Sequence, residues 1–181
     1  MSPGGASAPV EFRREVRLAD GRTVLVRPLV PTDAPELGEA MRHADPETLY
    51  RRFCGTPPRV TSRLLRHLTE LDYVRRFALA AVDPDTGRGV AVARYEATGE
   101  PGVADVAVVV DPAWRRVGLA TALIRMLAEA ALARGIRQFT ATYLPSNRPV
   151  AELLDDVGGK RVIAHGLAEG VVHLPPPGEA T

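Results

Sequence analysis

Cysteine and lysine are almost absent from this sequence of 181 residues, since each occurs once, as Cys54 and Lys160. A single cysteine excludes an internal disulfide and a zinc site built from several cysteines. Lysine and arginine together number 23 against 22 aspartates and glutamates, which gives a net charge of +1. Proteins that bind nucleic acid generally carry a basic excess, so this balance argues against a nucleic-acid partner.

Long apolar runs are missing as well. No stretch approaches the roughly 20 apolar residues that span a bilayer, so we expect no membrane partner. The N-terminus lacks the apolar core of a signal peptide, and we therefore expect a cytoplasmic protein. The four histidines do not have the spacing of metal ligands, and no metal site is expected.

The rest of the composition is that of a globular protein, with 45% hydrophobic and 25% charged residues. Residues 1–10 are small and aperiodic, which predicts a flexible leader. Residues 175–181 begin with three prolines and predict a tail that joins neither a helix nor a sheet. These ends leave one folded domain over residues 11–174.

Strand and helix patterns alternate within that domain. Alternating or continuous apolar runs predict strands over 22–29, 77–82, 89–97, 103–110, 136–144, 161–165 and 170–174. Capping residues and helical spacing predict helices over 34–43, 46–53, 61–71, 118–134 and 148–157. This order is not a regular βαβ repeat, and it favours a mixed α/β sheet.

The segment between the strand 103–110 and the helix that begins at Gly118 has the features of an anion site. The first turn of a helix leaves backbone N–H groups unpaired and carries partial positive charge. Gly118 allows a ligand to approach the backbone closely, and Ala120 keeps the next contact small. Arg115 and Arg116 add formal charge for a phosphate. The glycine spacing is neither that of a Walker A loop nor G-x-G-x-x-G.

The residues Arg115–Ala120 have the form R-x-x-G-x-A, which resembles the acetyl-CoA signature of the GNAT N-acetyltransferases. Within that family the chain is most similar to the bacterial protein lysine acetyltransferases that modify acyl-CoA synthetases. Besides the signature, the segments that carry this narrower resemblance are 48–53, 68–73, 92–95 and 147–149.

The resemblance implies an α/β GNAT fold, with a mixed, mostly antiparallel sheet of about 6–7 strands and helices on both faces. It also implies a splayed central strand pair that admits acetyl-CoA. The backbone of Val108, Val109 and Val110 would then pair with the pantetheine arm. The pyrophosphate would lie at the loop and first helical turn, formed by Arg115, Arg116, Val117, Gly118, Leu119, Ala120 and Thr121. Asn147 would bond the cofactor, or would simply cap the helix that follows it.

The family's catalytic base is a glutamate, and Asp105 stands at the matching position. Either burial in its apolar strand raises the pKa of Asp105 toward a useful value, or Asp105 faces solvent. Glu96 and Glu100 are weaker candidates. A backbone N–H of Val109 or Val110 would stabilise the oxyanion. No tyrosine follows Asn147 to protonate the leaving thiolate, and Tyr143 is expected to be a sheet residue.

Three functions fit these residues. The first is acetyl transfer from acetyl-CoA to a protein lysine, with an acyl-CoA synthetase as the expected partner. The second is acetylation of a small amine, and the third is a non-catalytic module that binds acyl-CoA. The shortened carboxylate and the missing tyrosine keep the third alternative open, and a fold alone does not choose among them.

Overall fold

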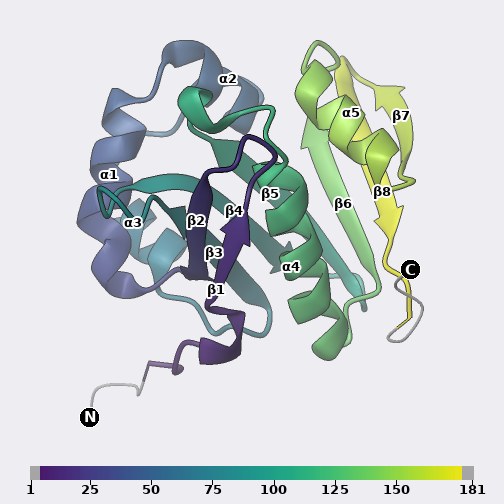
Figure 1. Cartoon of the computed structure of the whole chain (residues 1–181). Coiled ribbons are helices and arrows are strands. Elements are labelled where there is room, and N and C mark those ends of the chain that lie inside the picture. The colour runs from purple at the N-terminus through teal and green to yellow at the C-terminus, as the bar shows by residue number, and fades with distance from the viewer. Residues whose placement is uncertain (1–4, 177–181) are drawn as a thin grey trace.

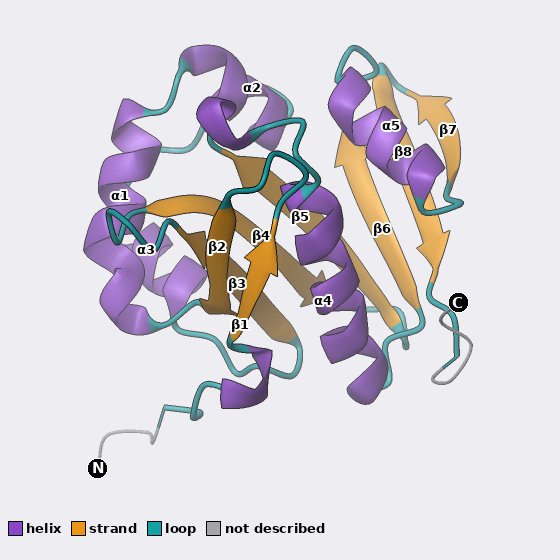
Figure 2. Cartoon of the chain, viewed as in Figure 1, coloured by secondary structure: helices purple, strands orange, loops and turns teal. Residues whose placement is uncertain are grey.

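The computed structural model describes residues 5–176, and its central feature is one mixed sheet of eight strands (Figures 1 and 2). The order of the strands across the sheet is β1-β2-β3-β4-β5-β6-β8-β7. Their bounds are β1 Arg14–Arg17, β2 Thr23–Pro28, β3 Arg76–Val82, β4 Gly89–Ala97, β5 Val103–Val110, β6 Gln138–Tyr143, β7 Lys160–Ala164 and β8 Leu167–His173. All neighbours are antiparallel except β5 and β6, which are parallel.

Five α-helices accompany the strands within the described residues. They are α1 Ala34–His43, α2 Pro46–Phe53, α3 Ser62–Thr69, α4 Leu119–Ala133 and α5 Arg148–Asp156. Short 3₁₀ turns precede β1, α1 and α4, at Val10–Phe12, Pro31–Asp33 and Pro112–Trp114. Residues 1–4 of the expected leader and residues 177–181 of the expected tail lie outside the described residues. No helix of residues 5–176 is long and apolar enough to cross a membrane.

The sequence predicts every helix and seven of these strands, and β1 is the strand that it misses. Only Val16 of β1 is apolar, and the other three residues are exposed. The strand is held at the edge of the sheet by its pairing with β2, so a periodic apolar pattern is not needed. The last two strands are closer together than expected, because His165 and Gly166 take left-handed conformations and make a tight hairpin turn.

The helices cover both faces of the sheet. Because side chains alternate along a strand, Tyr95 and Arg94 of β4 point to opposite faces. Tyr95 lies on the face that packs against α4, whereas the Arg94 side chain reaches the C-terminal end of α3, where it donates to the Leu68 carbonyl (2.8 Å). The expected arrangement, with helices on both faces, is confirmed.

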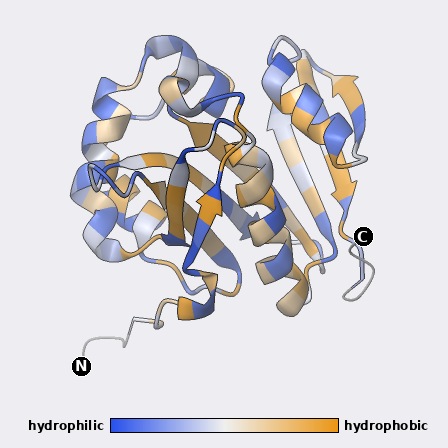
Figure 3. Cartoon of the chain, viewed as in Figure 1, coloured by the Kyte–Doolittle hydropathy of each residue, from blue (hydrophilic) through white to orange (hydrophobic). Residues whose placement is uncertain are grey.

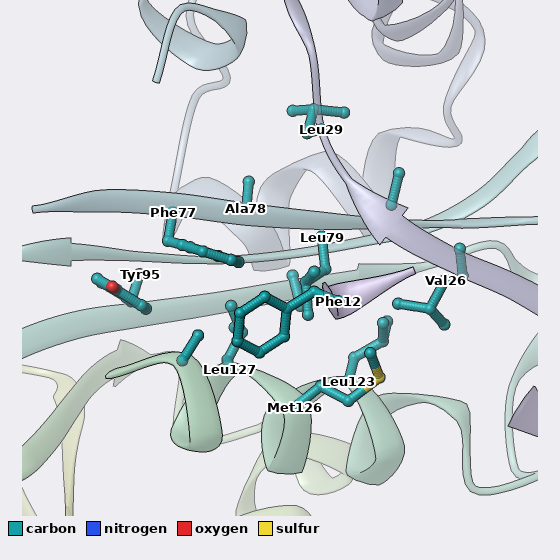
Figure 4. Packing of buried hydrophobic residues seen from close by; sticks show 14 of the residues in the cluster. Phe12, Val26, Leu29, Phe77, Ala78, Leu79, Tyr95, Leu123, Met126 and Leu127 are labelled. Carbon is teal, nitrogen blue, oxygen red and sulfur yellow. The ribbon is translucent and has the colours of Figure 1, made fainter. Parts of the chain in front are cut away.

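The main core lies between the sheet and α4 (Figure 4). The rings of Phe77 and Tyr95 are stacked with their centroids 5.8 Å apart, and the centroids of Tyr95 and Phe139 are 6.0 Å apart. Leu123 and Leu127 of α4 belong to the same cluster and are fully buried. Apolar positions run along the strands, as Figure 3 shows. Burial of this apolar surface fixes α4, and therefore its N-terminus, against β3, β4 and β5.

The pairing of β5 with β6 stops after three residues. Val103, Ala104 and Asp105 pair with Gln138, Phe139 and Thr140, and no pair follows. Val106–Val110 therefore have a strand partner on the β4 side alone. A second, small core of Tyr143, Leu154 and Ala168 forms on the other side of the opening. This is the splayed central pair that the resemblance implied.

Candidate functional site

The separation of β5 from β6 opens a cleft with a volume of about 2060 Å³. Its walls come from β5 and β6, from α4 along its length, from α5 and the end of α2, and from parts of β4 and β8. The residues that the sequence singled out as site residues line this cleft, with the exceptions of Val117 and the weaker candidate Glu100. Residues from position 48 to position 176 therefore meet at one place in the fold.

The open edge of β5 offers backbone groups to a ligand. In an antiparallel pair, the N–H and C=O groups of successive residues point alternately toward and away from the partner strand. The Asp111 N–H donates to the Val90 carbonyl (2.8 Å), and the register is regular through β5. The same alternation directs the N–H of Val109 toward β4, and those of Val108 and Val110 into the cleft. An extended, amide-containing arm would pair with Val108 and Val110.

The loop before α4 forms a cradle of unpaired N–H groups. Arg116 and Gly118 have left-handed backbone conformations (φ 61° and 83°), and Gly118 is the N-cap of α4 without a side-chain cap. Within the described part of the chain, no acceptor receives the N–H groups of residues 116–121. A Cβ at Gly118 would meet no protein atom within 4 Å. Such a helix N-terminus binds anions.

Two members of this segment contribute through their backbone. Leu119 is 1% exposed, so its side chain belongs to the core while its N–H belongs to the first turn of α4. The Val117 carbonyl accepts a hydrogen bond from the Ala19 N–H (3.0 Å), and its side chain packs against the main core. Val117 therefore holds the loop in place and does not line the cleft.

The two arginines of the loop differ in their contacts. Arg115 donates from Nε to the Val110 carbonyl (3.0 Å) and from Nη2 to the Thr48 hydroxyl (2.9 Å). It thereby ties the end of β5 to α2 and leaves part of its guanidinium for a ligand. Arg116 is exposed and has no hydrogen bond or ion pair within residues 5–176, which leaves its charge for a phosphate.

Asn147 occupies the N-cap position of α5, yet its side chain makes no capping hydrogen bond. The residue is 7% exposed and lines the cleft. The interpretation of Asn147 as a plain helix cap is wrong, because its geometry (φ −79°, ψ 76°) is not the extended one that capping needs. Its amide remains for a ligand in the cleft.

Asp105 lies at the last paired position of β5 and β6, where the cleft begins. Its carboxylate accepts a hydrogen bond from the Thr140 hydroxyl and is exposed. The alternative in which Asp105 is buried in its strand is therefore wrong, and the exposed one holds. The residue opposite Asp105 on β4 is Glu96, whose carboxylate lies 3.7 Å from Nε2 of His67. Glu100 is an exposed turn residue that does not line the cleft.

The sequence analysis does not assign three residues of the cleft to the site. The Tyr143 hydroxyl is buried and has no hydrogen-bond partner within the described residues, although the ring is a sheet residue as expected. Arg52 of α2 and Arg94 of β4 line the same cleft as Asp105. Both stand in segments that resemble the family, and that is the one sequence signal that could have pointed to them.

The geometry is that of a cofactor-binding cleft, and the comparison with protein families agrees. The model of the GNAT acetyltransferase domain matches residues 23–160. The chain belongs to the GNAT acetyltransferase family. GNAT enzymes take the acetyl group from acetyl-CoA, and the open strand edge and the N–H cradle fit the pantetheine arm and the pyrophosphate of this donor.

Relatives in sequence and structure are acetyltransferases as well. Acetyltransferase PA5475 of Pseudomonas aeruginosa is 32% identical over 87% of this chain and 86% of that protein. Acetyltransferase Pat of Mycolicibacterium smegmatis is 28% identical over 89% of this chain, and the match spans 49% of the Pat sequence. The crystal structure of the GNAT domain of S. lividans PAT has a TM-score of 0.85 at 31% identity, and covers 93% of this chain and all of that one.

Proposed function

We propose that this acetyltransferase transfers acetyl from acetyl-CoA to the ε-amine of a lysine in a protein substrate. The observation that carries the proposal is the position of Asp105, which stands exposed at the point where β5 and β6 separate. A carboxylate there is within the cleft that would hold the thioester and is open to an amine from outside. The resemblance to protein lysine acetyltransferases, in segments spread over the chain, supports the same acceptor class.

Acetyl-CoA would lie along the open edge of β5. Val108 and Val110 would pair with its pantetheine amides, and the N–H groups of residues 116–121 would hold its pyrophosphate. Asn147 would donate from its amide, and Arg116 would add charge at the phosphates. The acetyl carbonyl would accept from whichever of the open N–H groups lies beside it, and this bond strengthens as the oxyanion forms.

The chemistry then needs a neutral amine. A lysine ammonium has an ordinary pKa of about 10.4, so a base has to remove a proton before attack. Asp105 would accept this proton and pass it to solvent, to which the carboxylate is open. The amine nitrogen forms a bond to the thioester carbon and loses its second proton to solvent. The carbon–sulfur bond breaks, and CoA leaves as its thiolate, which solvent protonates. No covalent enzyme intermediate is required.

The exposure of the carboxylates beside the cleft favours a protein acceptor over a small amine. An enzyme for a small polyamine would enclose its substrate between several carboxylates, whereas Asp105 and Glu96 are both exposed. An acyl-CoA synthetase is the acceptor that the resemblance suggests, and its place of action would be the cytoplasm. The alternative of a non-catalytic module that binds acyl-CoA predicts no turnover with any acceptor.

The test measures release of free CoA thiol from acetyl-CoA, with an acyl-CoA synthetase as one acceptor and a set of small amines as others. We expect acetylation of the protein, and a fall in kcat of about 10²- to 10⁴-fold in Asp105→Asn. Asp85→Asn, at an exposed position of the β3–β4 turn, is the matched control and should be unchanged. Turnover of small amines alone would overturn the acceptor class, and full activity of Asp105→Asn would overturn its role as the base.

A further inference from the structure

Within residues 5–176, two half-buried arginines of the cleft lack a carboxylate partner. Arg94 projects from β4 on the face opposite to α4, and Arg52 stands in the last turn of α2. Both side chains are half-buried and line the cleft. The Arg94 guanidinium has one hydrogen bond, to the Leu68 carbonyl, and that of Arg52 lies 5.0 Å from the Phe53 ring centroid. Most of their donors are therefore unused.

The charges of these two side chains are close enough to repel each other. Burial, followed by the charges of Arg52 and Arg76, lowers the pKa of Arg94 to about 10, against a smaller opposing effect of Glu96. Burial also lowers the pKa of Arg52. Both guanidiniums nevertheless remain cationic at neutral pH. Within residues 5–176 no ion pair joins either to a carboxylate, whereas Arg14 and Arg27 each have one.

Cations that are held together and partly withdrawn from water are costly, and a bound anion offsets that cost. The position of Arg94 indicates which anion this is. Arg94 pairs with Ala107 across the β4–β5 ladder, so it is the diagonal neighbour of Asp105 on the same face. Such neighbours have Cβ atoms about 7–8 Å apart. The N–H cradle of α4, in contrast, already provides for the phosphates of the donor.

One face of the sheet therefore presents two halves of opposite charge. Asp105 and Glu96 form the anionic half, which suits the ammonium of an acceptor. Arg94 and Arg52 form the cationic half, in which Arg94 stands on the same strand as Glu96 and two residues from it. We propose that Arg52 and Arg94 bind a carboxylate that the acceptor carries close to its reactive amine. This inference rests on the proposed function, and it assigns as substrate a lysine that has an aspartate or glutamate beside it.

The same chemistry is present in a free amino acid, so the test has two arms. The first compares a peptide in which glutamate precedes lysine with the same peptide carrying glutamine. The second compares free lysine with cadaverine, which is lysine without its carboxylate. With acetyl-CoA as donor, we expect kcat/KM to be roughly 10- to 100-fold higher for the glutamate peptide, as for a charge-assisted hydrogen bond.

Variants of the two arginines test whether Arg52 and Arg94 are the source of this preference for the glutamate peptide. In Arg52→Gln and Arg94→Gln the ratio between the two peptides should fall toward one, and Arg88→Gln, at an exposed turn position, should retain it. The ratio does not depend on the fraction of folded protein, because both peptides report on the same active molecules. Arg52→Gln removes no hydrogen bond within the described residues, so it remains informative where Arg94→Gln destabilises the fold.

The outcomes distinguish a failure of this inference from a failure of the proposed function. Equal rates for both peptides, or a preference that survives both variants, would overturn the inference alone. Preference for free lysine over cadaverine without peptide acetylation would overturn the protein acceptor and support the inference. If no acceptor reacts, titration of isotope-labelled protein with glutarate still tests the site, since unshifted arginine Nε–H signals overturn it. A stronger, arginine-dependent preference for succinyl-CoA as donor would place the carboxylate on the acyl group and also overturn it.

Discussion

The Thr140 hydroxyl donates a hydrogen bond to the Asp105 carboxylate across the last paired position of β5 and β6. Beyond this pair the strands separate, so the proposed base is fixed at the apex of the cleft by a residue from the opposite wall. A carboxylate on a short side chain has few rotamers, and one hydrogen bond is sufficient to orient it. Thr140 is thus a positioning residue for Asp105.

Replacing Thr140 with valine removes this hydrogen bond and keeps the shape of the side chain. We expect kcat to fall about three- to tenfold with a lysine acceptor, as for loss of an exposed charge-assisted hydrogen bond. The KM for acetyl-CoA should not change, because Thr140 lies away from the N–H cradle. Steady-state kinetics of Thr140→Val and Thr140→Ser provide the measurement, and the serine variant should recover the rate. A rise in the KM for acetyl-CoA with unchanged kcat would show that Thr140 serves the cofactor instead.

A second prediction concerns Gly118 and uses Gly87 as its match. Both have left-handed φ angles, 83° and 71°, and at neither would a Cβ meet protein atoms within 4 Å. Substitution by alanine should therefore cost each about 1–2 kcal/mol of unfolding free energy, from backbone strain alone. Only at Gly118 would the new methyl group lie at the proposed pyrophosphate cradle.

We expect Gly118→Ala to raise the KM for acetyl-CoA by about tenfold or more, and Gly87→Ala to leave it unchanged. Chemical denaturation measures the shared loss of stability, and calorimetric titration with acetyl-CoA measures the difference. Equal affinities in the two variants would place the pyrophosphate elsewhere.

A third prediction separates ligand binding from helix capping. Thr61 caps α3 through a hydrogen bond from the Leu64 N–H (3.1 Å), whereas the Asn147 side chain caps nothing. Thr61→Ala should cost about 1 kcal/mol of stability and spare the affinity for acetyl-CoA. Asn147→Ala should show the reverse, with little loss of stability and a rise in the KM for acetyl-CoA. Loss of stability without loss of affinity in Asn147→Ala would return this residue to a capping role.

The features of the fold that depend on one or two neighbouring residues can be predicted from the sequence. Asp45 and Pro46 begin α2, Gly135 ends α4 with a left-handed residue, and Gly118 marks the loop that the signature defines. Each of these depends on the conformational preference of one or two residues, so no partner needs to be known. The strand β1 lacks such a signal, because the edge of β2 alone holds it in place.

The arrangement of side chains in the cleft depends instead on contacts between distant segments. The exposure of Asp105 follows from where β6 stops pairing, and the freedom of the Asn147 amide follows from the backbone angles at the start of α5. Arg52 and Arg94 are 42 positions apart in the numbering, and only the fold brings both to one cleft. The sequence could nominate the segments that contain them, but it could not show that their charges are unpaired.

The last prediction concerns the buried hydroxyl of Tyr143, which has no partner among the described residues and lines the cleft. An unpaired buried hydroxyl costs about 1–3 kcal/mol, so Tyr143→Phe should raise the unfolding free energy of the free protein. The hydroxyl of Tyr95, in contrast, donates to the Val74 carbonyl at 2.9 Å, and Tyr95→Phe should lower stability.

If the Tyr143 hydroxyl finds its partner in bound acetyl-CoA, the stabilisation that saturating acetyl-CoA confers should be smaller in Tyr143→Phe and unchanged in Tyr95→Phe. Thermal unfolding with and without acetyl-CoA measures both quantities, and an equal ligand effect in all three proteins would leave Tyr143 outside the binding site.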